Sequence, residues 1–496
     1  MNKRSLWTST AAALLVAAAL AGCGTTTYFA GRVLPPSGVA NRVLIAIQNP
    51  SAFTTGSLQF VDAYYDIRFK YNSANTSPAY SISGYAGNLP VTIQNTPEEL
   101  GGAVYSSGDG GFNLISYSQE KLQGTVSGLN GHSSSIFITR NQSFVFAANQ
   151  SSHELTVVDR SSSSAGSYAL NLPGVYRVSV NPSGSAALAF VQNSNYVYYP
   201  RKLTAAQSLA YAGGPTTWPK AAVDCEPQNA PGWCLFQVQS PDNTDATGNY
   251  YGTPLVFDRP VKAVFSADGG TAYVLNCGPE CGGNTASVTP FPVAPMIFLI
   301  GQQSGTLLTQ SALASKTIPI PGGASNALVN STTLYVVGQK LMHDGFWGGY
   351  LTVVNLSTNT VSIPAVSISD GSPGGANSAL GAPPSRMLLA DDNTLWIGMT
   401  GCTNGERANN GLPYGCLTMF NTSTNTVTLL EPYIGDATGI AAVTNLHKIY
   451  TAEGGQVYIY STVDGTEIDN QYVTVTGTAY DVAYMDADSD DDNTVY

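Results

Sequence analysis

Seven cysteines occur in the chain, and six of them fall into three pairs that are close in sequence. The pairs are Cys225 with Cys234, Cys277 with Cys281, and Cys402 with Cys416. Such spacing allows two kinds of chemistry, disulfide formation or metal binding. The segment "CGPEC" lacks a second cysteine pair or histidines at zinc spacing, so no metal site is expected. In a chain exported to an oxidising compartment, the three pairs are expected to form local disulfides.

The seventh cysteine, Cys23, follows a segment with the layout of an export signal. Residues 1–22 contain Lys3 and Arg4, then the apolar run "AAALLVAAAL", then two small residues directly before the cysteine. The apolar run is shorter than the roughly 20 residues that a membrane-spanning helix needs, and no other stretch of the sequence comes closer. The mature chain is therefore not expected to be an integral membrane protein.

The motif "LAGC" around Cys23 resembles the lipobox of bacterial lipoproteins, whose cysteine is acylated and becomes the first residue after cleavage. The resemblance implies a lipoprotein signal peptide over 1–22, a lipid on Cys23, and an anchor and tether over 23–39. The alternative is an ordinary cleaved signal followed by an unpaired thiol. Gly24 replaces the aspartate that often signals inner-membrane retention, which favours the outer membrane.

The charge of the chain excludes one class of partner. Without Lys3 and Arg4 the chain has 18 basic and 32 acidic residues, a net charge of −14. Nucleic acid is therefore not expected as a partner. Charged residues make up only 10% of the sequence, but 43% is hydrophobic and spread in short runs, so the chain can bury a large core.

No sequence motif for a known catalytic centre is present. The sequence contains no GxSxG, HExxH, phosphate-binding Gly-Lys-Ser/Thr or dinucleotide-binding glycine pattern. The four histidines, none beside a cysteine or serine in a nucleophile motif, are His132, His153, His343 and His447. No cofactor is expected, and enzymatic activity is disfavoured without being excluded, since a triad assembled from distant segments leaves no local motif.

The elements that must position these residues are strands. Short apolar runs separated by Gly, Asn, Asp and Pro continue from about residue 40 to the end, without a long helical pattern. Residues 261–276, "VKAVFSADGGTAYVLN", read as a strand, a tight turn and a second strand, and variants of this unit recur along the chain. A second hairpin lies between units, most clearly at 350–363 and 416–430. Two hairpins per repeat predict four-stranded antiparallel blades of a β-propeller.

The repeat resembles the YVTN branch of the propeller families, whose pattern is V-x-x-S-P-D-G-x-x-x-Y-V-x-N. Residues 261–276 follow it closely, except that Ala267 replaces the proline. Eight residues fit the second-strand anchor position: Ala46, Tyr105, Phe146, Phe190, Tyr273, Tyr335, Trp396 and Tyr450. Since the resembled family usually has seven blades, seven and eight both stay open. We expect an all-β, single closed propeller over 40–496, with an insertion around 200–255 and closure by pairing of N- and C-terminal strands.

Aligning the first strands of the units predicts a site at the mouth of the central channel. The alignment puts Arg177, Lys262, Arg386 and Asp481 in one equivalent position, on the strands that line the channel of a propeller. Three cations in a narrow, partly desolvated space repel each other unless something negative joins them. Asp481 could supply that charge in a structural ion-pair ring. Alternatively, one carboxylate does not neutralise three cations, and the site binds a carboxylate or phosphate ligand.

A second candidate site lies on the rim, where the loops after the second strands are long. These loops carry His343, Asp344, Trp347, Arg407 and Tyr414, which mix aromatic and charged groups. Such a patch could bind a sugar or a peptide, or the loops could simply cap the propeller.

Together these features predict a lipid-anchored, extracytoplasmic β-propeller that binds or scaffolds a partner at the bacterial cell envelope. The expected partners are the membrane, through the lipid, and a protein, a glycan or a small anion. The alternative is a hydrolase, for example a propeller-type lactonase, acting at the central channel. Similarity of fold alone does not establish that activity.

Overall fold

The structure is a computed structural model, and almost all of its regular elements are strands. It describes residues 35–49, 55–69, 79–161, 166–227, 231–240, 242–244, 250–293, 309–341, 347–369, 384–400, 416–430, 434–468 and 473–486. Within these ranges there are two α-helices, α2 (Ala205–Tyr211) and α3 (Gln310–Lys316). Neither helix in this part of the chain has the length and apolar character that spanning a membrane requires.

Seven antiparallel sheets follow one another along the chain, here called blades 1 to 7. Blade 1 contains β3 (Pro90–Thr96), β4 (Gly101–Ser106), β5 (Gly111–Ser116) and β6 (Lys121–Thr125). Blade 2 contains β7 (Ser135–Ile138), β8 (Phe144–Asn149), β9 (Glu154–Asp159) and β10 (Gly166–Asn171). Blade 3 begins with β11 (Val175–Val180), β12 (Ala187–Val191) and β13 (Val197–Lys202).

The remaining four of these sheets have the same strand order. Blade 4 contains β18 (Pro260–Phe265), β19 (Thr271–Asn276), β20 (Ser287–Pro292) and β21 (Ile318–Pro319). Blade 5 contains β22 (Asn326–Asn330), β23 (Thr333–Leu341), β24 (Trp347–Asn355) and β25 (Thr360–Ser367). Blade 6 contains β26 (Pro384–Ala390), β27 (Thr394–Met399), β28 (Cys416–Asn421) and β29 (Thr426–Leu430). Blade 7 contains β30 (Ala437–Val443), β31 (Lys448–Glu453), β32 (Gln456–Ser461) and β33 (Glu467–Ile468).

Blade 8 closes the ring from both ends of the chain. Its innermost strand is β34 (Thr478–Tyr484), which pairs with β1 (Arg42–Gln48), and β1 in turn pairs with β2 (Ser57–Asp62). A bridge from Gln59 to Ser81 extends this three-stranded sheet outward. The all-β propeller fold and its closure by strands from the two ends are therefore confirmed, and the number of blades is eight.

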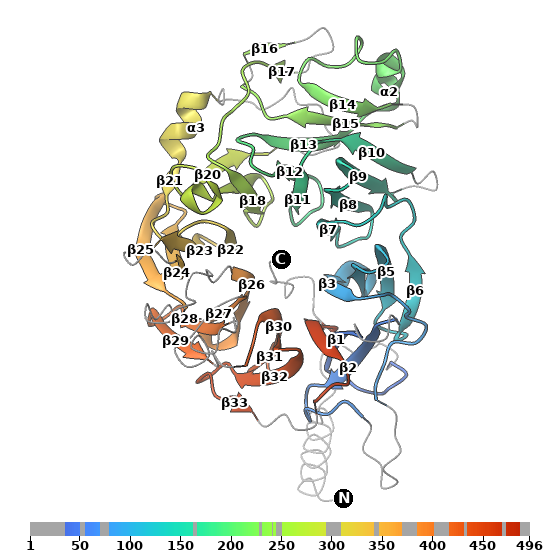
Figure 1. The fold of residues 1–496 in the computed structure, drawn as a ribbon, viewed down its shortest axis with the longest axis vertical. Coiled ribbons are helices and arrows are strands. Elements are labelled where there is room, and N and C mark those ends of the chain that lie inside the picture. The colour runs from blue at the N-terminus through green and yellow to red at the C-terminus, as the bar shows by residue number, and fades with distance from the viewer. Residues whose placement is uncertain are drawn as a thin grey trace, which may run out of the picture.

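The eight blades surround a central channel. In Figure 1 the labels of β3, β7, β11, β18, β22, β26 and β30 lie nearest the middle of the ring. Each innermost strand contacts the innermost strand of the next blade, and β34 contacts both β30 and β3, so the innermost strands form an unbroken circle. The eight second-strand anchors predicted from the sequence all lie in second strands, from Ala46 in β1 to Tyr450 in β31.

The core lies between neighbouring blades. Trp396 of blade 6 is fully buried, and its ring lies 5.9 Å from that of Tyr460 in blade 7. In the same way Phe146 of blade 2 packs against Trp233 at 6.2 Å. Because each blade buries one face against the blade before it and one against the blade after it, its strands are apolar on both faces.

The repeated outer hairpins form because their turns carry asparagine at two fixed positions. The side-chain oxygen of Asn421 accepts hydrogen bonds from the backbone nitrogens of Ser423 and Thr424, at 3.0 and 2.9 Å. Asn425 then takes a left-handed conformation with φ of 58°, which asparagine tolerates better than most residues. The turn at 355–360 repeats this arrangement, with Asn359 at φ of 53°.

Blade 3 is larger than the others. Its sheet continues from β13 to β15 (Trp233–Gln237) and then to β14 (Ala222–Glu226). The segment 203–255, which corresponds to the predicted insertion, also contains α2 and the short pair β16 (Asn243–Thr244) and β17 (Tyr250–Tyr251).

Candidate functional site

The predicted channel residues occupy one level of the circle of innermost strands. The eight equivalent positions, here called the channel ring, are Thr92, Ser135, Arg177, Lys262, Asn326, Arg386, Gly439 and Asp481. In six of the eight strands the pairing with the second strand skips the residue directly before this position. The skipped residues are Val91, Tyr176, Val261, Ser385, Thr438 and Tyr480. Such a bulge redirects the following side chain, so the ring is a repeated feature of the backbone.

Arg386 and Asp481 lie two positions apart in the ring and form an ion pair. Nη2 of Arg386 lies 3.5 Å from Oδ2 of Asp481, and the side chains are 12% and 1% exposed. The position between them belongs to Gly439. A Cβ atom there would lie 2.6 Å from Oδ1 of Asp481 and 2.7 Å from the backbone nitrogen of Val482. Glycine therefore leaves the space that the carboxylate occupies.

Main-chain groups also hold the Asp481 carboxylate. Oδ2 accepts a hydrogen bond from the backbone nitrogen of Ile93 in blade 1 at 2.8 Å, and Oδ1 accepts one from Val482 at 3.0 Å. Burial raises the pKa of Asp481 to about 6, while Arg386 and the two N–H groups act in the opposite direction. This side chain therefore titrates close to neutral pH.

Lys262 lies on the opposite half of the ring and is buried, with 5% exposure. Its Nζ donates a hydrogen bond to Oδ1 of Asn326, the next ring position, at 2.9 Å. Burial holds the pKa of Lys262 well below its ordinary value, and the positive charges of Arg177 and Arg386 lower it further. Arg177 and Arg386 therefore act electrostatically on Lys262.

Arg177 has a different environment from the other two cations. Its guanidinium carbon lies 5.8 Å from the ring centroid of the adjacent Tyr176. Burial lowers the pKa of Arg177, although arginine stays charged at neutral pH even so. The ring therefore combines permanently charged guanidinium groups with a lysine whose charge is costly to maintain.

A cavity of about 280 Å³ extends along the channel from the ring, on the side of blades 1 to 5. Lys262 lines it at the ring, and Arg140 and Pro182 line it where β7 and β11 end in turns. The wall between them is formed by the innermost strands and combines polar and apolar groups. The cavity therefore has a cation at the ring and a mixed lining.

Two of the predicted disulfides are confirmed. Cys225 is bonded to Cys234, joining the paired strands β14 and β15, and Cys277 is bonded to Cys281. Cys416 at the start of β28 is also disulfide-bonded, and its predicted partner Cys402 lies outside the described residues.

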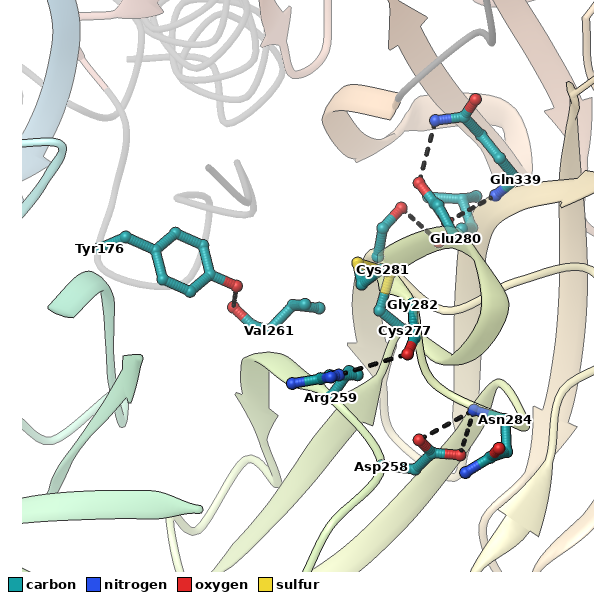
Figure 2. The surroundings of a disulfide bond; sticks show 12 residues. Tyr176, Asp258, Arg259, Val261, Cys277, Glu280, Cys281, Gly282, Asn284 and Gln339 are labelled. Atoms are coloured by element: carbon teal, nitrogen blue, oxygen red, sulfur yellow. Dashed lines mark hydrogen bonds between the residues drawn. A yellow bond between two sulfur atoms is a disulfide. The ribbon is translucent and has the colours of Figure 1, made fainter. Parts of the chain in front are cut away.

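The Cys277–Cys281 loop links blade 4 to blade 5. Its 3₁₀-helix, η3 (Gly278–Cys281), presents Glu280 to β23, as Figure 2 shows. The carboxylate accepts hydrogen bonds from the backbone nitrogen and the side-chain amide of Gln339, at 3.0 and 2.9 Å. Burial raises the pKa of Glu280, and the two bonds from Gln339 oppose that rise. The disulfide thus stiffens a contact between two blades.

The predicted rim site falls largely outside the described residues. His343, Asp344, Arg407 and Tyr414 all lie there, as does the predicted lipidation site Cys23. Trp347 is described, and it is partly buried at the start of β24, where it pairs with Leu341 of β23.

Several channel residues were missed by sequence reasoning. Ser179 follows the ring in blade 3, and its Oγ accepts a hydrogen bond from the backbone nitrogen of Ala263 in blade 4 at 3.1 Å. Gln94 connects blade 1 to blade 2 by bonds to Ile136 and Ile138. Serine and glutamine at these positions leave no sequence signal, because what distinguishes them is the backbone of another blade. Arg140 also lines the cavity, and its charge near the end of a first strand could have indicated it.

Comparisons with known proteins leave the family open. No protein-family model matches the sequence, and no curated protein matches it either.

Many solved structures share the propeller architecture at low sequence identity. AztD from Citrobacter koseri is 10% identical, with a TM-score of 0.47 over 90% of this chain and 97% of its own. The dihydro-heme d1 dehydrogenase NirN is 11% identical, with a TM-score of 0.48 over 87% of this chain and 72% of its own. A proposed 6-phosphogluconolactonase from Bacteroides fragilis is 10% identical, with a TM-score of 0.42 over 90% and 99%.

Proposed function

We propose that this chain is a lipid-anchored binding module of the bacterial cell envelope that holds a small anion at the channel ring. The observation that supports it most is that Arg177, Lys262 and Arg386, from three blades, share one level of the ring, where Arg386 pairs with Asp481. The pKa of Lys262 is lowered first by burial and then by the positive charges of Arg177 and Arg386, so both arginines repel the Lys262 ammonium. An incoming carboxylate, phosphate or sulfate would relieve that repulsion.

The ring is better suited to binding than to hydrolysis. A hydrolase acting in the channel would need convergent carboxylates, a histidine or a metal to move protons or activate water. The ring carboxylate, Asp481, is engaged by Arg386 and two backbone N–H groups. In the described ranges no cluster of three or more metal-ligating side chains occurs. A propeller-type lactonase activity in the channel is therefore the second candidate function.

Replacing Lys262 by methionine is expected to weaken sulfate binding about 10- to 100-fold while leaving the folded state as stable or more stable. The loss corresponds to one charge-assisted hydrogen bond. The stability follows because methionine fills similar space without a charge that burial disfavours. Isothermal titration with sulfate measures the first effect, and urea denaturation without sulfate measures the second.

The control for this substitution is Lys121→Met, which removes a lysine that is exposed at the start of β6. If Lys262→Met destabilises the protein, the ring is structural. The ring is also structural if the unsubstituted protein does not bind sulfate. Arg386→Ala is a poorer test, because it would leave the Asp481 carboxylate buried without its guanidinium partner.

The envelope location is supported by the disulfides, which indicate folding in an extracytoplasmic, oxidising compartment. The lipobox resemblance adds the anchor at Cys23, and Gly24 favours the outer membrane. The rim residues could contact a protein or a glycan once the domain is held at the membrane.

Cys23→Ser is expected to release the protein from the membrane fraction, because acylation needs the thiol and the described ranges contain no membrane-spanning helix. Fractionation of cells followed by a salt wash measures this. Cys277→Ser, which affects a disulfide instead, should leave the attachment intact. Retention of the Cys23→Ser variant in washed membranes would contradict the anchor.

A further inference from the structure

The turn after the third strand is built in the same way in five of the blades. In each, the second residue of the turn donates a backbone hydrogen bond to the side chain of the last residue of the strand. The donors, at 2.9 to 3.2 Å, are Ser161, Ser357, Ser423, Val463 and Tyr64. Since only the backbone of the second residue takes part, the turn does not determine which side chain that residue carries.

Blades 7 and 8 carry large hydrophobic side chains at this position, where blades 2, 5 and 6 carry serine. Val463 of blade 7 is 66% exposed, and Tyr64 of blade 8 is 62% exposed. Tyr65 follows with 67% exposure, and its ring lies nearly perpendicular to that of Tyr64, with 4.9 Å between the centroids. Single exposed hydrophobic side chains are common on protein surfaces. Three of them on the turns of two neighbouring blades, in turns that do not need them, indicate a contact surface.

The turn that carries the two tyrosines is held firmly against blade 7. Nζ of Lys448 in blade 7 donates to Oδ2 of Asp66 at 2.6 Å and to the carbonyl of Ala63 at 3.0 Å. The hydroxyl of Tyr450 also donates to Asp66, and the backbone nitrogen of Ala63 donates to the carbonyl of Asn41 at 2.9 Å. The tyrosines therefore project from a fixed backbone, and a partner that binds them does not have to order the turn.

The chain from Cys23 reaches the propeller on the same face as these turns. The backbone nitrogen and the hydroxyl of Ser37 donate to the two carboxylate oxygens of Glu120, at 2.9 and 2.6 Å. Glu120 lies in the turn after the third strand of blade 1, which is the neighbour of blade 8. Because the third strands of a propeller all run in the same direction, the turns that follow them share one face. Cys23 stands 14 positions before Ser37, so the two residues are at most about 50 Å apart.

From these observations we infer that Tyr64, Tyr65 and Val463 form a membrane-docking surface, which tilts blades 7 and 8 onto the lipid bilayer. This inference rests on the proposed function, since it requires the lipid on Cys23. Tyrosine suits the headgroup region, because its ring is apolar and its hydroxyl keeps contact with water. The chain is acidic, so the attraction comes from these side chains and not from charge pairing with anionic lipids. The tether raises the effective concentration of the surface at the bilayer, so a contact of three side chains is sufficient.

Photo-crosslinking of the full chain in isolated bacterial membranes tests the docking surface. Benzoylphenylalanine is placed at position 64 or 463, and mass spectrometry measures the fraction of the chain that gains a phospholipid after irradiation. The matched control carries it at position 357, the equivalent turn position in blade 5. A second control carries it in place of Leu341, which is 52% exposed at the end of β23 on the opposite face. Positions 64 and 463 should capture lipid severalfold more often than either control, also after a salt wash.

A second comparison tests whether the tyrosines cause the docking. In the chain with benzoylphenylalanine at position 463, the substitutions Tyr64→Ser and Tyr65→Ser should lower lipid capture severalfold. Serine stands at the position of Tyr64 in three other blades, so the turn is expected to keep its shape. The control substitution Leu341→Ser should leave lipid capture at position 463 unchanged.

The outcomes separate this inference from the proposed function. Lipid capture that is highest at positions 64 and 463 and falls in the serine variants supports the docking surface. Equal capture at position 357, higher capture at position 341, or no effect of the serine substitutions overturns it and leaves the anchor intact. Capture of a protein instead of a lipid at position 64 also overturns it, because the surface then belongs to a protein partner. If the unsubstituted chain is absent from the membranes, the lipid anchor itself fails, and this inference fails with it.

Discussion

Replacing Arg42 by methionine is expected to lower the free energy of unfolding by about 3 to 5 kcal/mol. Arg42 begins β1 and is 1% exposed. Its Nη2 lies 2.6 Å from Oδ1 of Asp486, just beyond β34, and its Nη1 lies 2.9 Å from Oε1 of Glu120. Nη1 also donates to the carbonyl of Tyr117 at 2.8 Å. One guanidinium thus joins blade 8 to blade 1, and its removal leaves two buried carboxylates without a counter-charge.

Urea denaturation followed by tryptophan fluorescence measures this loss. The comparison variant is His447→Ala, because His447 is about half exposed and its pair with Asp392 should contribute less than about 1 kcal/mol. Neutralising all three partners with Arg42→Met, Glu120→Gln and Asp486→Asn should recover much of the lost stability. A single Arg42→Met substitution that costs no more than the His447 control would contradict the role of this cluster in closing the ring.

Sulfate binding is expected to strengthen about 10- to 100-fold when the pH falls from 8 to 5. Sulfate stays fully ionised over this range, so the change reports the protein alone. The pKa of Asp481 is raised to about 6, and protonation removes a negative charge from the ring. A unit charge at about 6 Å contributes roughly 2 to 3 kcal/mol at an effective dielectric constant of about 20. Protonation of Lys262, whose pKa is lowered, acts in the same direction.

The control for this pH dependence is Asp481→Asn, which should bind sulfate more tightly at pH 8 and lose most of the dependence near pH 6. The same pKa affects stability with a defined sign. Because Asp481 holds its proton more tightly in the folded state than at its ordinary pKa of 3.8, its contribution to folding decreases as the pH rises from about 4 to 6. Sulfate affinity that is flat with pH, or that rises toward pH 8, would contradict this account.

The blade pattern was predictable from sequence because each unit carries its own local signals. Trp396 and Tyr450 mark second strands because seven of the eight blades have an aromatic at that position, which packs against a neighbouring blade. The asparagines of the outer hairpins, such as Asn421, mark turns through bonds to residues two and three positions later. Such signals require no knowledge of the other blades, so they can be read one repeat at a time.

The channel was predictable only in part. Aligning first strands brought Arg386 and Asp481 together, since equivalent positions of a closed ring share one level. The alignment did not reveal why glycine stands at 439, because the atoms that exclude a Cβ belong to Asp481 and Val482 of the next blade. The cavity depends in the same way on which side chains of separate blades leave space unfilled. A single repeat does not contain that information.

The pairing of β34 with β1 also determines when the molecule becomes complete during synthesis. Arg42 and Asp486 are separated by 444 positions, so the sheet of blade 8 lacks its innermost strand until nearly the whole chain has been made. Until then the inner edge of β1 has unpaired backbone groups, which can recruit a strand from another chain. Because the two segments are so far apart in sequence, their pairing is the slowest contact to form. The entropic cost of closing the loop between them grows only with the logarithm of the number of residues that separate them. A circular permutant that places β34 directly before β1 would convert this closure into a local hairpin and move the late-closing edge to another blade.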